Sequence, residues 1–377
     1  MSEDWRKRLD VVVGLEKEKR VLVWWQPFLP AGRTVPSGIC LRYATVESPV
    51  IVAKPPPPPP VPESVVHSAL DSVVLNTLAH QPSGSRTSLP QLVQQYLERS
   101  GRVLDQQLPY EPQPSQPRRV NFDASQSEDR GVHLIAHCVQ EGNRHKVTLS
   151  SGFALNAPGD HMNESVIVTC AHTLEEIRWS PLLVLPPGSQ PFLAPPDLPG
   201  ARSSGTVVLS GTPTGPALHP VTAVLSSLHR SDLLLLSRAG PSIPPLPVSP
   251  YPAKPGTIVR AHFFSDVRPQ GEDGEGWVPW IGGSWVKWVR GTVLGYRDFA
   301  GREAQPGTYD SLSHMLFKPP PTAGSSGGPI VDEETGAVVG VMLGTRMDNR
   351  VEGVRGWGVP AEAIFEMFSL PGLNLKR

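Results

Sequence analysis

A serine set among glycines is the strongest sign of chemistry in this sequence. The stretch 322–329 reads Thr-Ala-Gly-Ser-Ser-Gly-Gly-Pro, with Ser326 between Gly324 and Gly327. Glycine permits the tight turn that a nucleophilic serine requires, and it leaves room for a substrate backbone beside the hydroxyl. The pattern predicts acyl transfer at Ser326, although a Gly/Ser-rich surface turn would have the same composition.

Two further stretches supply the groups that would activate such a serine. Residues 165–172 form a β-branched run that ends in His172, which predicts a strand that delivers an imidazole at its end. Asp232 stands directly before a run of leucines, which predicts a buried strand. An imidazole can take the proton of a serine hydroxyl, and a carboxylate can fix the tautomer of that imidazole. His172 is therefore the expected base, and Asp232 the residue that orients it.

Other residues of the same types are alternatives. His229 lies close to Asp232 in the sequence and could act as a base, but a surface loop explains it more simply. Asp160 and Asp310 could replace Asp232, but neither is followed by an apolar strand. The chain order His172, Asp232, Ser326 is also the order in which chymotrypsin-type triads occur.

In this order and in its local motifs, the chain resembles the trypsin/chymotrypsin-fold serine endopeptidases, closest to their HtrA/Deg branch. The resemblance spans roughly residues 130–370 and is carried by the segments 151–154, 168–172, 232–233, 324–329 and 356–360. It implies an all-β fold of two antiparallel six-stranded barrels with the triad in the cleft between them. It also implies an oxyanion hole made by the backbone N–H groups of Gly324 and Ser326.

The resemblance also suggests where a substrate side chain would bind. In trypsin-like enzymes the floor of the primary pocket lies six residues before the nucleophile, which is Pro320 in this chain. Because no carboxylate is present there, we expect cleavage after small or medium apolar residues rather than after Lys or Arg. The expected walls come from the strand after the nucleophile, namely Val341, Leu343, Gly344 and Thr345.

Composition limits the other classes of function. The 377-residue chain has a net charge of −1, which gives no reason to expect nucleic acid or an anionic membrane as a partner. No apolar run approaches the ~20 residues that span a bilayer.

The proposed reaction uses protein or peptide substrates and needs neither metal nor cofactor. A histidine-rich stretch lacks the spacing of a zinc site; it contains His133, His137, Cys138 and His145.

The cysteines and the first residues indicate the compartment. Cys40, Cys138 and Cys170 are too few for a disulfide framework, which favours a reducing environment. The charged start of the chain is unlike a secretory signal peptide. We therefore expect an intracellular protein, cytoplasmic in the first instance, with the nucleus and the peroxisome as alternatives.

Proline, at 44 of the 377 residues, divides the chain. Pro55–Pro60 predicts a polyproline II segment, a stiff spacer or a ligand for an SH3- or WW-type groove. Short β-branched runs follow from residue 131, one of them at 182–185, and a last helix is expected at 361–368. The expected organisation is a mixed segment at 1–54, a polyproline spacer at 55–62, a helical segment at 63–104, a linker at 105–130, a first barrel at 131–239, a connection at 240–256, and a second barrel with a C-terminal helix at 257–377.

A second function from another class remains open at this point. The chain could be a catalytically idle module with a protease fold that acts through its Pro-rich N-terminal region. The presence of all three triad residues argues for the enzyme. The resemblance would also allow a PDZ domain after the protease, but too few residues follow the last expected helix.

Overall fold

The structure is a computed structural model of the whole chain. It describes residues 68–80, 87–122, 131–158, 164–183, 202–212, 215–270, 274–349 and 353–370. The chain divides into a unit at 1–59 and a unit at 60–377, and all described residues belong to the second. The segment 1–54, Cys40 and the Pro55–Pro60 run lie outside the described residues, so the prediction of an SH3 or WW partner stays a prediction.

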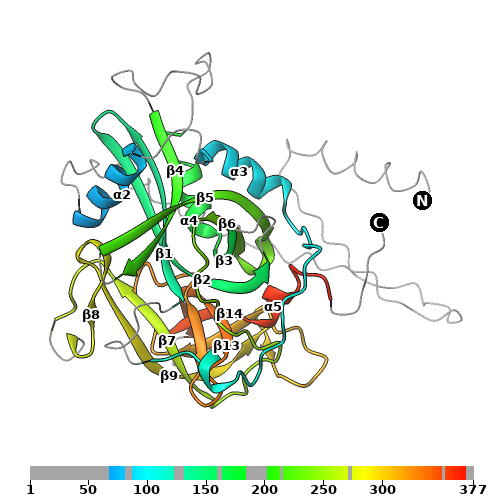
Figure 1. Ribbon diagram of the computed structural model, residues 1–377. Coiled ribbons are helices and arrows are strands. Elements are labelled where there is room, and N and C mark those ends of the chain that lie inside the picture. The colour runs from blue at the N-terminus through cyan, green and yellow to red at the C-terminus, as the bar shows by residue number, and fades with distance from the viewer. Residues whose placement is uncertain are drawn as a thin grey trace, which may run out of the picture. The chain divides into compact units, whose positions relative to one another are not determined.

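The first barrel closes in the strand order β1-β2-β3-β6-β5-β4, with every pair antiparallel (Figure 1). Its strands are rich in β-branched and leucine residues, and β3 and β6 are buried on both faces along most of their length. The expected strand at 182–185 is wrong in its described part, since residues 181–183 form a turn. The strands are β1 (Val132–Glu141), β2 (Arg144–Pro158), β3 (Glu164–Cys170), β4 (Arg202–Thr212), β5 (Gly215–Leu228) and β6 (Leu233–Ala239).

The second barrel closes in the order β7-β9-β11-β14-β13-β12, because β12 pairs back to β7 and β7 also pairs with β9. The two antiparallel six-stranded barrels predicted from the resemblance are therefore confirmed. The strands are β7 (Ile258–Ser265), β9 (Trp285–Arg297), β11 (His314–Lys318), β12 (Pro329–Asp332), β13 (Val338–Asn349) and β14 (Gly353–Pro360), while the short β8 (Val278–Pro279) and β10 (Glu303–Ala304) add to β9.

Strand β14 has a glycine-rich sequence that does not predict a strand. The packing of its neighbours explains why glycine is present. A Cβ at Gly356 would lie 2.6 Å from the ring of Phe317 on the neighbouring β11. A Cβ at Gly358 would lie 2.6 Å from the carbonyl oxygen of Val341 on β13. Glycine is required at both positions because the barrel interior leaves no room for a side chain.

One hydrophobic core joins the two barrels. The same cluster contains Val168 and Leu233 from the first barrel and Val331 and Val341 from the second, all fully buried. Buried apolar area of this kind is the main favourable contribution to folding, so the interface between the barrels is as firmly packed as either interior. This packing fixes the residues that meet at the junction.

Two helices of the N-terminal region cover the first barrel (Figure 1). Helix α2 (Ala69–His80) packs against β1 and β4, and α3 (Leu89–Glu98) packs against β5. Ser88 and Gln91 form a capping box at the start of α3, which satisfies backbone N–H groups that the helix leaves free. Helix α4 (His172–Arg178) follows β3, and α5 (Glu362–Phe365) is shorter than the helix expected at 361–368. Within the expected helical segment 63–104, Ala69–His80 and Leu89–Glu98 are helical, and residues 99–104 are not.

The expected linker at 105–130 instead makes specific contacts in its described part. From α3 the chain continues past both barrels, and Leu104 N–H donates to Met367, Glu111 N–H to Val248 and Val120 N–H to Gly336. Leu104 and Leu108 are buried in the core that joins the barrels. We call residues 100–122 the strap. Composition suggested a linker because polar and proline residues outnumber the few apolar anchors.

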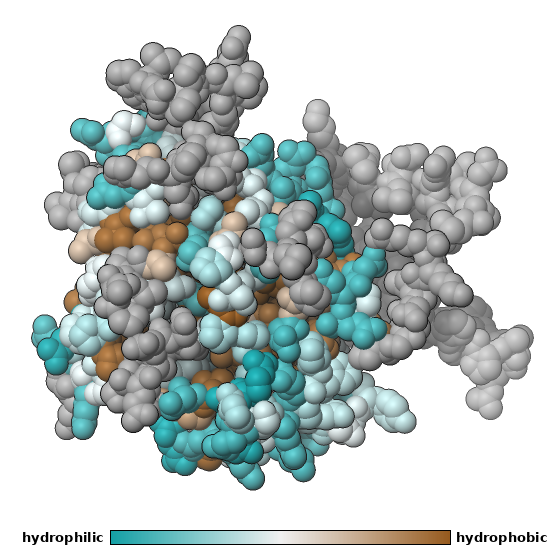
Figure 2. All heavy atoms as spheres, in the orientation of Figure 1, coloured by the Kyte–Doolittle hydropathy of each residue, from teal (hydrophilic) through white to brown (hydrophobic). Residues whose placement is uncertain are grey.

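One face of the molecule carries both polar and apolar side chains. Figure 2 shows hydrophilic side chains over much of the visible face, interrupted by apolar patches. Among the described residues, no helix is both long enough and apolar enough to cross a membrane.

Candidate active site

The three residues singled out from the sequence lie at the junction of the barrels. His172 is the first residue of α4, directly after β3, and Asp232 lies in the turn before β6. Strands β3 and β6 are neighbours with Cys170 opposite Leu233, so the ends of the two strands bring His172 and Asp232 together. Ser326 belongs to the second barrel, in the loop between β11 and β12.

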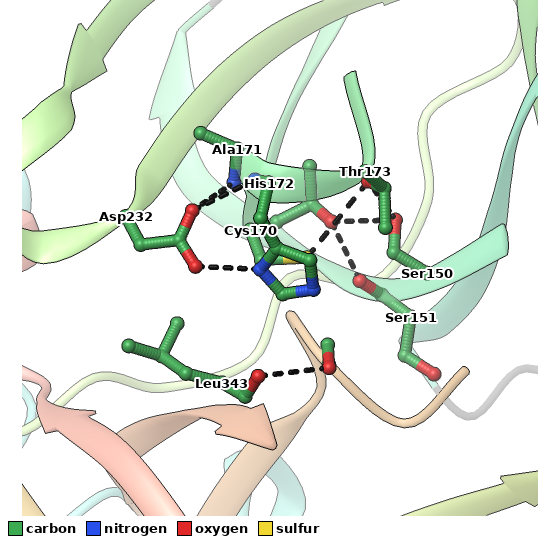
Figure 3. A network of polar contacts seen from close by, with 10 residues as sticks. Ser150, Ser151, Cys170, Ala171, His172, Thr173, Asp232 and Leu343 are labelled. Atoms are coloured by element: carbon green, nitrogen blue, oxygen red, sulfur yellow. Dashed lines mark hydrogen bonds and ion pairs between the residues drawn. The ribbon is translucent and has the colours of Figure 1, made fainter. Parts of the chain in front are cut away.

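Asp232 holds His172 at two points. Its Oδ2 lies 2.6 Å from His172 Nδ1, and its Oδ1 accepts the backbone N–H groups of His172 and Ala171 at 2.7 and 3.0 Å (Figure 3). The carboxylate thus fixes the imidazole and also caps the N-terminus of α4, where no side chain of the helix does so. The arrangement places Nδ1–H on the carboxylate and leaves Nε2 available as a base.

The backbone of Asp232 is strained in this position. It has φ 53° and ψ 35°, and it is the one residue other than glycine with a positive φ among the described residues. Left-handed backbone is uncommon outside glycine, and aspartate is among the residues that tolerate it best. Such strain persists where surrounding contacts impose it, and the three hydrogen bonds to α4 do so here.

The loop that carries Ser326 requires its glycines. Gly324 has φ 82°, and a Cβ on it would lie 2.5 Å from the ring of Phe264. Gly327 has φ 84°, and its Cβ would lie 2.2 Å from the carbonyl oxygen of Ser151 on β2. The loop is thus pressed between the two barrels, and Ser151 N–H donates to the carbonyl oxygen of Ser326 at 2.8 Å.

Ser325, next to the candidate nucleophile, has a structural role. It is fully buried, and its Oγ accepts the backbone N–H of Phe264 at 2.9 Å and lies 2.9 Å from Thr322 Oγ1. The N–H groups of Gly324 and Ser326 have no acceptor among the described residues. Two amide donors one residue apart in a tight turn are the arrangement that an oxyanion hole uses.

Ser326 and His172 are not hydrogen-bonded to each other in this structure. Ser326 Oγ donates to the carbonyl oxygen of Leu343 at 3.0 Å, as the lower dashed line in Figure 3 shows. His172 Nε2 instead lies 3.7 Å from Cys170 Sγ. Hydrogen bonds of a catalytic site are often loose without substrate and tighten in the reacting complex.

Cys170 is a neighbour of the base that sequence reasoning missed. The sequence predicted no role for Cys170 beside the base, and its side chain is fully buried. The signal was its position two residues before His172, where a strand turns into a helix and the thiol can fold back to the imidazole. Burial disfavours the imidazolium of His172, but the contacts with Asp232 and Cys170 outweigh it and raise the pKa of His172 above its usual value.

The alternative residues have other partners. Asp310 accepts the backbone N–H of Gln305 at 3.0 Å, and His229 packs against the ring of Tyr96 at 4.4 Å. Asp160 lies outside the described residues. His133 and His137 hydrogen-bond inside the first barrel to Ser210 and Thr206, each at 2.8 Å.

The residues expected to bind substrate divide into three groups. Leu343 and Gly344 lie beside Ser326, and a Cβ at Gly344 would be 3.9 Å from Ser326 Oγ. Val341 is wrong as a pocket wall, because its side chain is fully buried in the core between the barrels. Thr345 and Pro320 are exposed, the latter in the loop between β11 and β12.

Comparison with known proteins gives one sequence family and several structures. The family model of the trypsin-like peptidase domain matches residues 150–341. No curated protein sequence matches the chain. Among solved structures, Deg5 is similar at 17% identity and TM-score 0.39, over 67% of this chain and 93% of that one. The MamO protease domain from Magnetospirillum magneticum is similar at 16% identity and TM-score 0.36, over 65% and 100% of the two chains. The Rv3671c protease from M. tuberculosis is similar at 20% identity and TM-score 0.36, over 67% and 85%.

Proposed function

Because the chain belongs to the trypsin-like peptidase family, we propose that it is a serine endopeptidase with Ser326 as nucleophile, His172 as base and Asp232 as the residue that orients the base. The observation that carries the proposal is the contact of both Asp232 carboxylate oxygens with His172. The loop that carries Ser326 requires glycine on both sides of this serine. No metal or cofactor is part of the proposed reaction.

The reaction would follow from the positions of these groups. Ser326 Oγ leaves the carbonyl oxygen of Leu343 and attacks the carbonyl carbon of the scissile bond, while His172 Nε2 takes the hydroxyl proton. The oxyanion that forms is stabilised by the N–H groups of Gly324 and Ser326. The C–N bond then breaks as His172 returns the proton to the leaving amine, and water hydrolyses the acyl-enzyme by the same sequence.

The proposed specificity is for small or medium apolar residues at P1. The loop from Lys318 to Ser326 contains no carboxylate that could pair with a basic side chain. Asp332, an acid beyond the nucleophile, instead caps a turn by accepting the N–H groups of Glu334 and Thr335. An unpaired Lys or Arg would lose its hydration without compensation, whereas an aliphatic side chain gains by burial.

A fluorophosphonate probe tests the assignment. Wild-type protein should form a covalent adduct that peptide mass spectrometry places on Ser326, and Ser326→Ala protein should form none. Ser311→Ala is a suitable control, because Ser311 is an exposed serine outside this loop. Adduct formation at the same rate in Ser326→Ala protein would refute the proposal.

An intracellular location belongs to the same proposal, since no disulfide joins the described cysteines Cys138 and Cys170. The alternative of an idle interaction module has no observation in its favour among the described residues.

A further inference from the structure

A row of three rings lies on the outer face of the second barrel, next to the proposed nucleophile. Phe299, His314 and Trp357 form this aromatic row, with ring centroids 6.3 Å apart for the first pair and 4.2 Å for the stacked second pair. At one end the guanidinium of Arg230 lies 5.9 Å over Phe299, and at the other the guanidinium of Arg346 lies 4.2 Å over Trp357. Neither arginine is close to the other in sequence.

Both ends of the row adjoin the proposed catalytic residues. Arg230 belongs to the turn that carries Asp232, and it pairs with Glu366. Trp357 is directly opposite Gly344 in the β13–β14 register, and cross-strand partners project from the same face of a sheet. A Cβ at Gly344 would point to within 3.9 Å of Ser326 Oγ, so the indole projects on the side of the sheet where Ser326 lies.

Strand β13 has a free edge that begins beside Ser326. Strand β12 pairs with it only as far as Val341, whereas β14 pairs with its other edge as far as Asn349. Within the described ranges, no strand pairs with the free edge from Leu343 onward. An unpaired row of backbone N–H and C=O groups is a ready template for an extended peptide.

The direction of such a peptide follows from the barrel. All strand pairs in this barrel are antiparallel, so a peptide that continues the pattern runs antiparallel to β13. Because β13 leads away from Ser326, peptide residues opposite Arg346 come before the scissile bond. Arg346 is two positions beyond Gly344, which is about 7 Å of strand. The peptide residue that meets Arg346 is therefore the third or fourth before the cleaved bond.

Arg346 carries a positive charge that no described acid neutralises. It lies directly opposite Arg355 on β14, and like charges in this relation destabilise a sheet. Asp348 on the same strand is engaged by Arg297 at 3.0 Å. Other arginines of this barrel have carboxylate partners: Arg260 and Arg290 with Glu333, and Arg302 with Asp298. Arg346 has none among the described residues, and it is exposed.

The stack leaves the hydrogen-bonding edge of the guanidinium available. The guanidinium of Arg346 lies over the face of the indole, and its N–H groups point outward in the guanidinium's own plane, where a carboxylate can accept two of them. His314 contributes as a neutral ring, because burial and the charge of Arg346 lower its pKa. Trp357 thus holds the side chain of Arg346 in one orientation before a ligand arrives, which lowers the entropy lost on binding.

We infer that Arg346, held on Trp357, binds a carboxylate side chain at the third or fourth residue before the scissile bond, so that the substrates are polypeptide segments with Asp or Glu at P3 or P4. This inference rests on the proposed function, because it takes Ser326 as the point of cleavage.

Matched peptides that differ only in Glu or Gln at P3 and at P4 test the inference. In one of the two pairs, with Glu at P3 or at P4, wild-type protein at low salt should cleave the Glu peptide with kcat/KM about three- to tenfold above that of the Gln peptide. Addition of 0.5 M salt should reduce this ratio. Arg346→Gln should bring the ratio to about one, and Arg346→Glu should favour a Lys peptide. Arg268→Gln is the matched control, since Arg268 is also exposed and lies 4.9 Å over Trp285.

Peptide binding to Ser326→Ala protein, followed by calorimetry, separates this inference from the proposed function. If the Glu peptide binds more tightly than the Gln peptide, and Arg346→Gln removes the difference, the inference is supported. Failure of wild-type protein to cleave either peptide would refute the proposed peptidase activity, but not this binding result. Equal cleavage and equal binding of the Glu and Gln peptides would overturn the inference alone. Equal loss of the preference in Arg268→Gln and Arg346→Gln protein would also overturn it.

Discussion

Ser326 Oγ lies 3.0 Å from the carbonyl oxygen of Leu343 and donates its hydrogen bond to that strand, not to His172. Leu343 is the extra residue of a bulge, because Met342 and Gly344 pair with consecutive residues of β14. The bulge turns the Leu343 carbonyl toward the serine loop. In the proposed reaction, the Ser326 hydroxyl would exchange the Leu343 carbonyl oxygen for His172 Nε2, and Nε2 would leave Cys170 Sγ.

Replacement of Asp232 by asparagine should reduce kcat by about 10³- to 10⁴-fold. If the asparagine oxygen keeps the backbone N–H groups of Ala171 and His172, the amide NH2 faces His172 Nδ1 and donates to it. The imidazole proton then sits on Nε2, which can no longer act as the base. The protein should remain folded, since an asparagine oxygen can still cap α4. Steady-state kinetics and thermal unfolding measure the two effects. Unchanged kcat would contradict the assigned role.

Replacement of Cys170 by alanine should move the acid limb of the kcat/KM profile to lower pH. His172 acts as a base only when neutral, so activity appears as the pH rises through its pKa. The contact with Cys170 contributes to raising that pKa, and its removal should lower it. Cys138→Ala is the control, because Cys138 is a buried cysteine that bonds to Gly205 in the first barrel. A limb that does not move in Cys170→Ala protein would show that the thiol leaves the base unaffected.

Replacement of Gly324 by alanine should lower kcat by about 10²- to 10³-fold, the loss expected when an oxyanion donor is displaced. The new Cβ would collide with Phe264, and the backbone with φ 82° must shift. Gly307→Ala is the matched control, since Gly307 has φ 80° but open space around its Cβ. Both variants carry the cost of a positive φ, so only the collision differs. Similar kcat values for the two variants would argue against the Gly324 donor.

Acid should destabilise the first barrel through two buried histidines. Burial lowers the pKa of both His133 and His137 to about 3, below the 6.5 of an exposed imidazole. The unfolded chain therefore binds more protons, and stability present above pH 6.5 is lost as the pH falls toward 3. The unfolding temperature of the double variant His133→Asn/His137→Gln should depend less steeply on pH over this range. An equally steep dependence would assign the acid sensitivity to other groups.

A chain that begins at Asp123 should be much less stable than one that begins at Pro60. The shorter chain lacks α2, α3 and the strap, which place Leu78, Leu92 and Leu104 in buried positions. Each such side chain contributes about 1.5–3 kcal/mol on burial. Chemical denaturation of both chains measures the difference. Equal stability would mean that the strap and helices are dispensable for the fold of the barrels.

Local sequence was sufficient to identify the proposed triad and the fold class. A serine between glycines, a histidine at a strand end and an aspartate before a leucine run each carry their signal within a few residues. Alternating short strands and turns likewise predicted an all-β fold, since strand formation follows local pattern, whereas the arrangement in two barrels was implied by the resemblance.

The tertiary structure decided what depends on register and on distant packing. The bulge at Leu343 shifts the alternation of β13, so that Val341 and Gly344, which are three residues apart, lie on the same face of the sheet, opposite Val359 and Trp357. The grouping of His314, Arg346 and Trp357 requires three strands to pair in one register. A sequence lists these residues far apart, and only the closed sheet, with a side-chain period of two, determines which of them share a face.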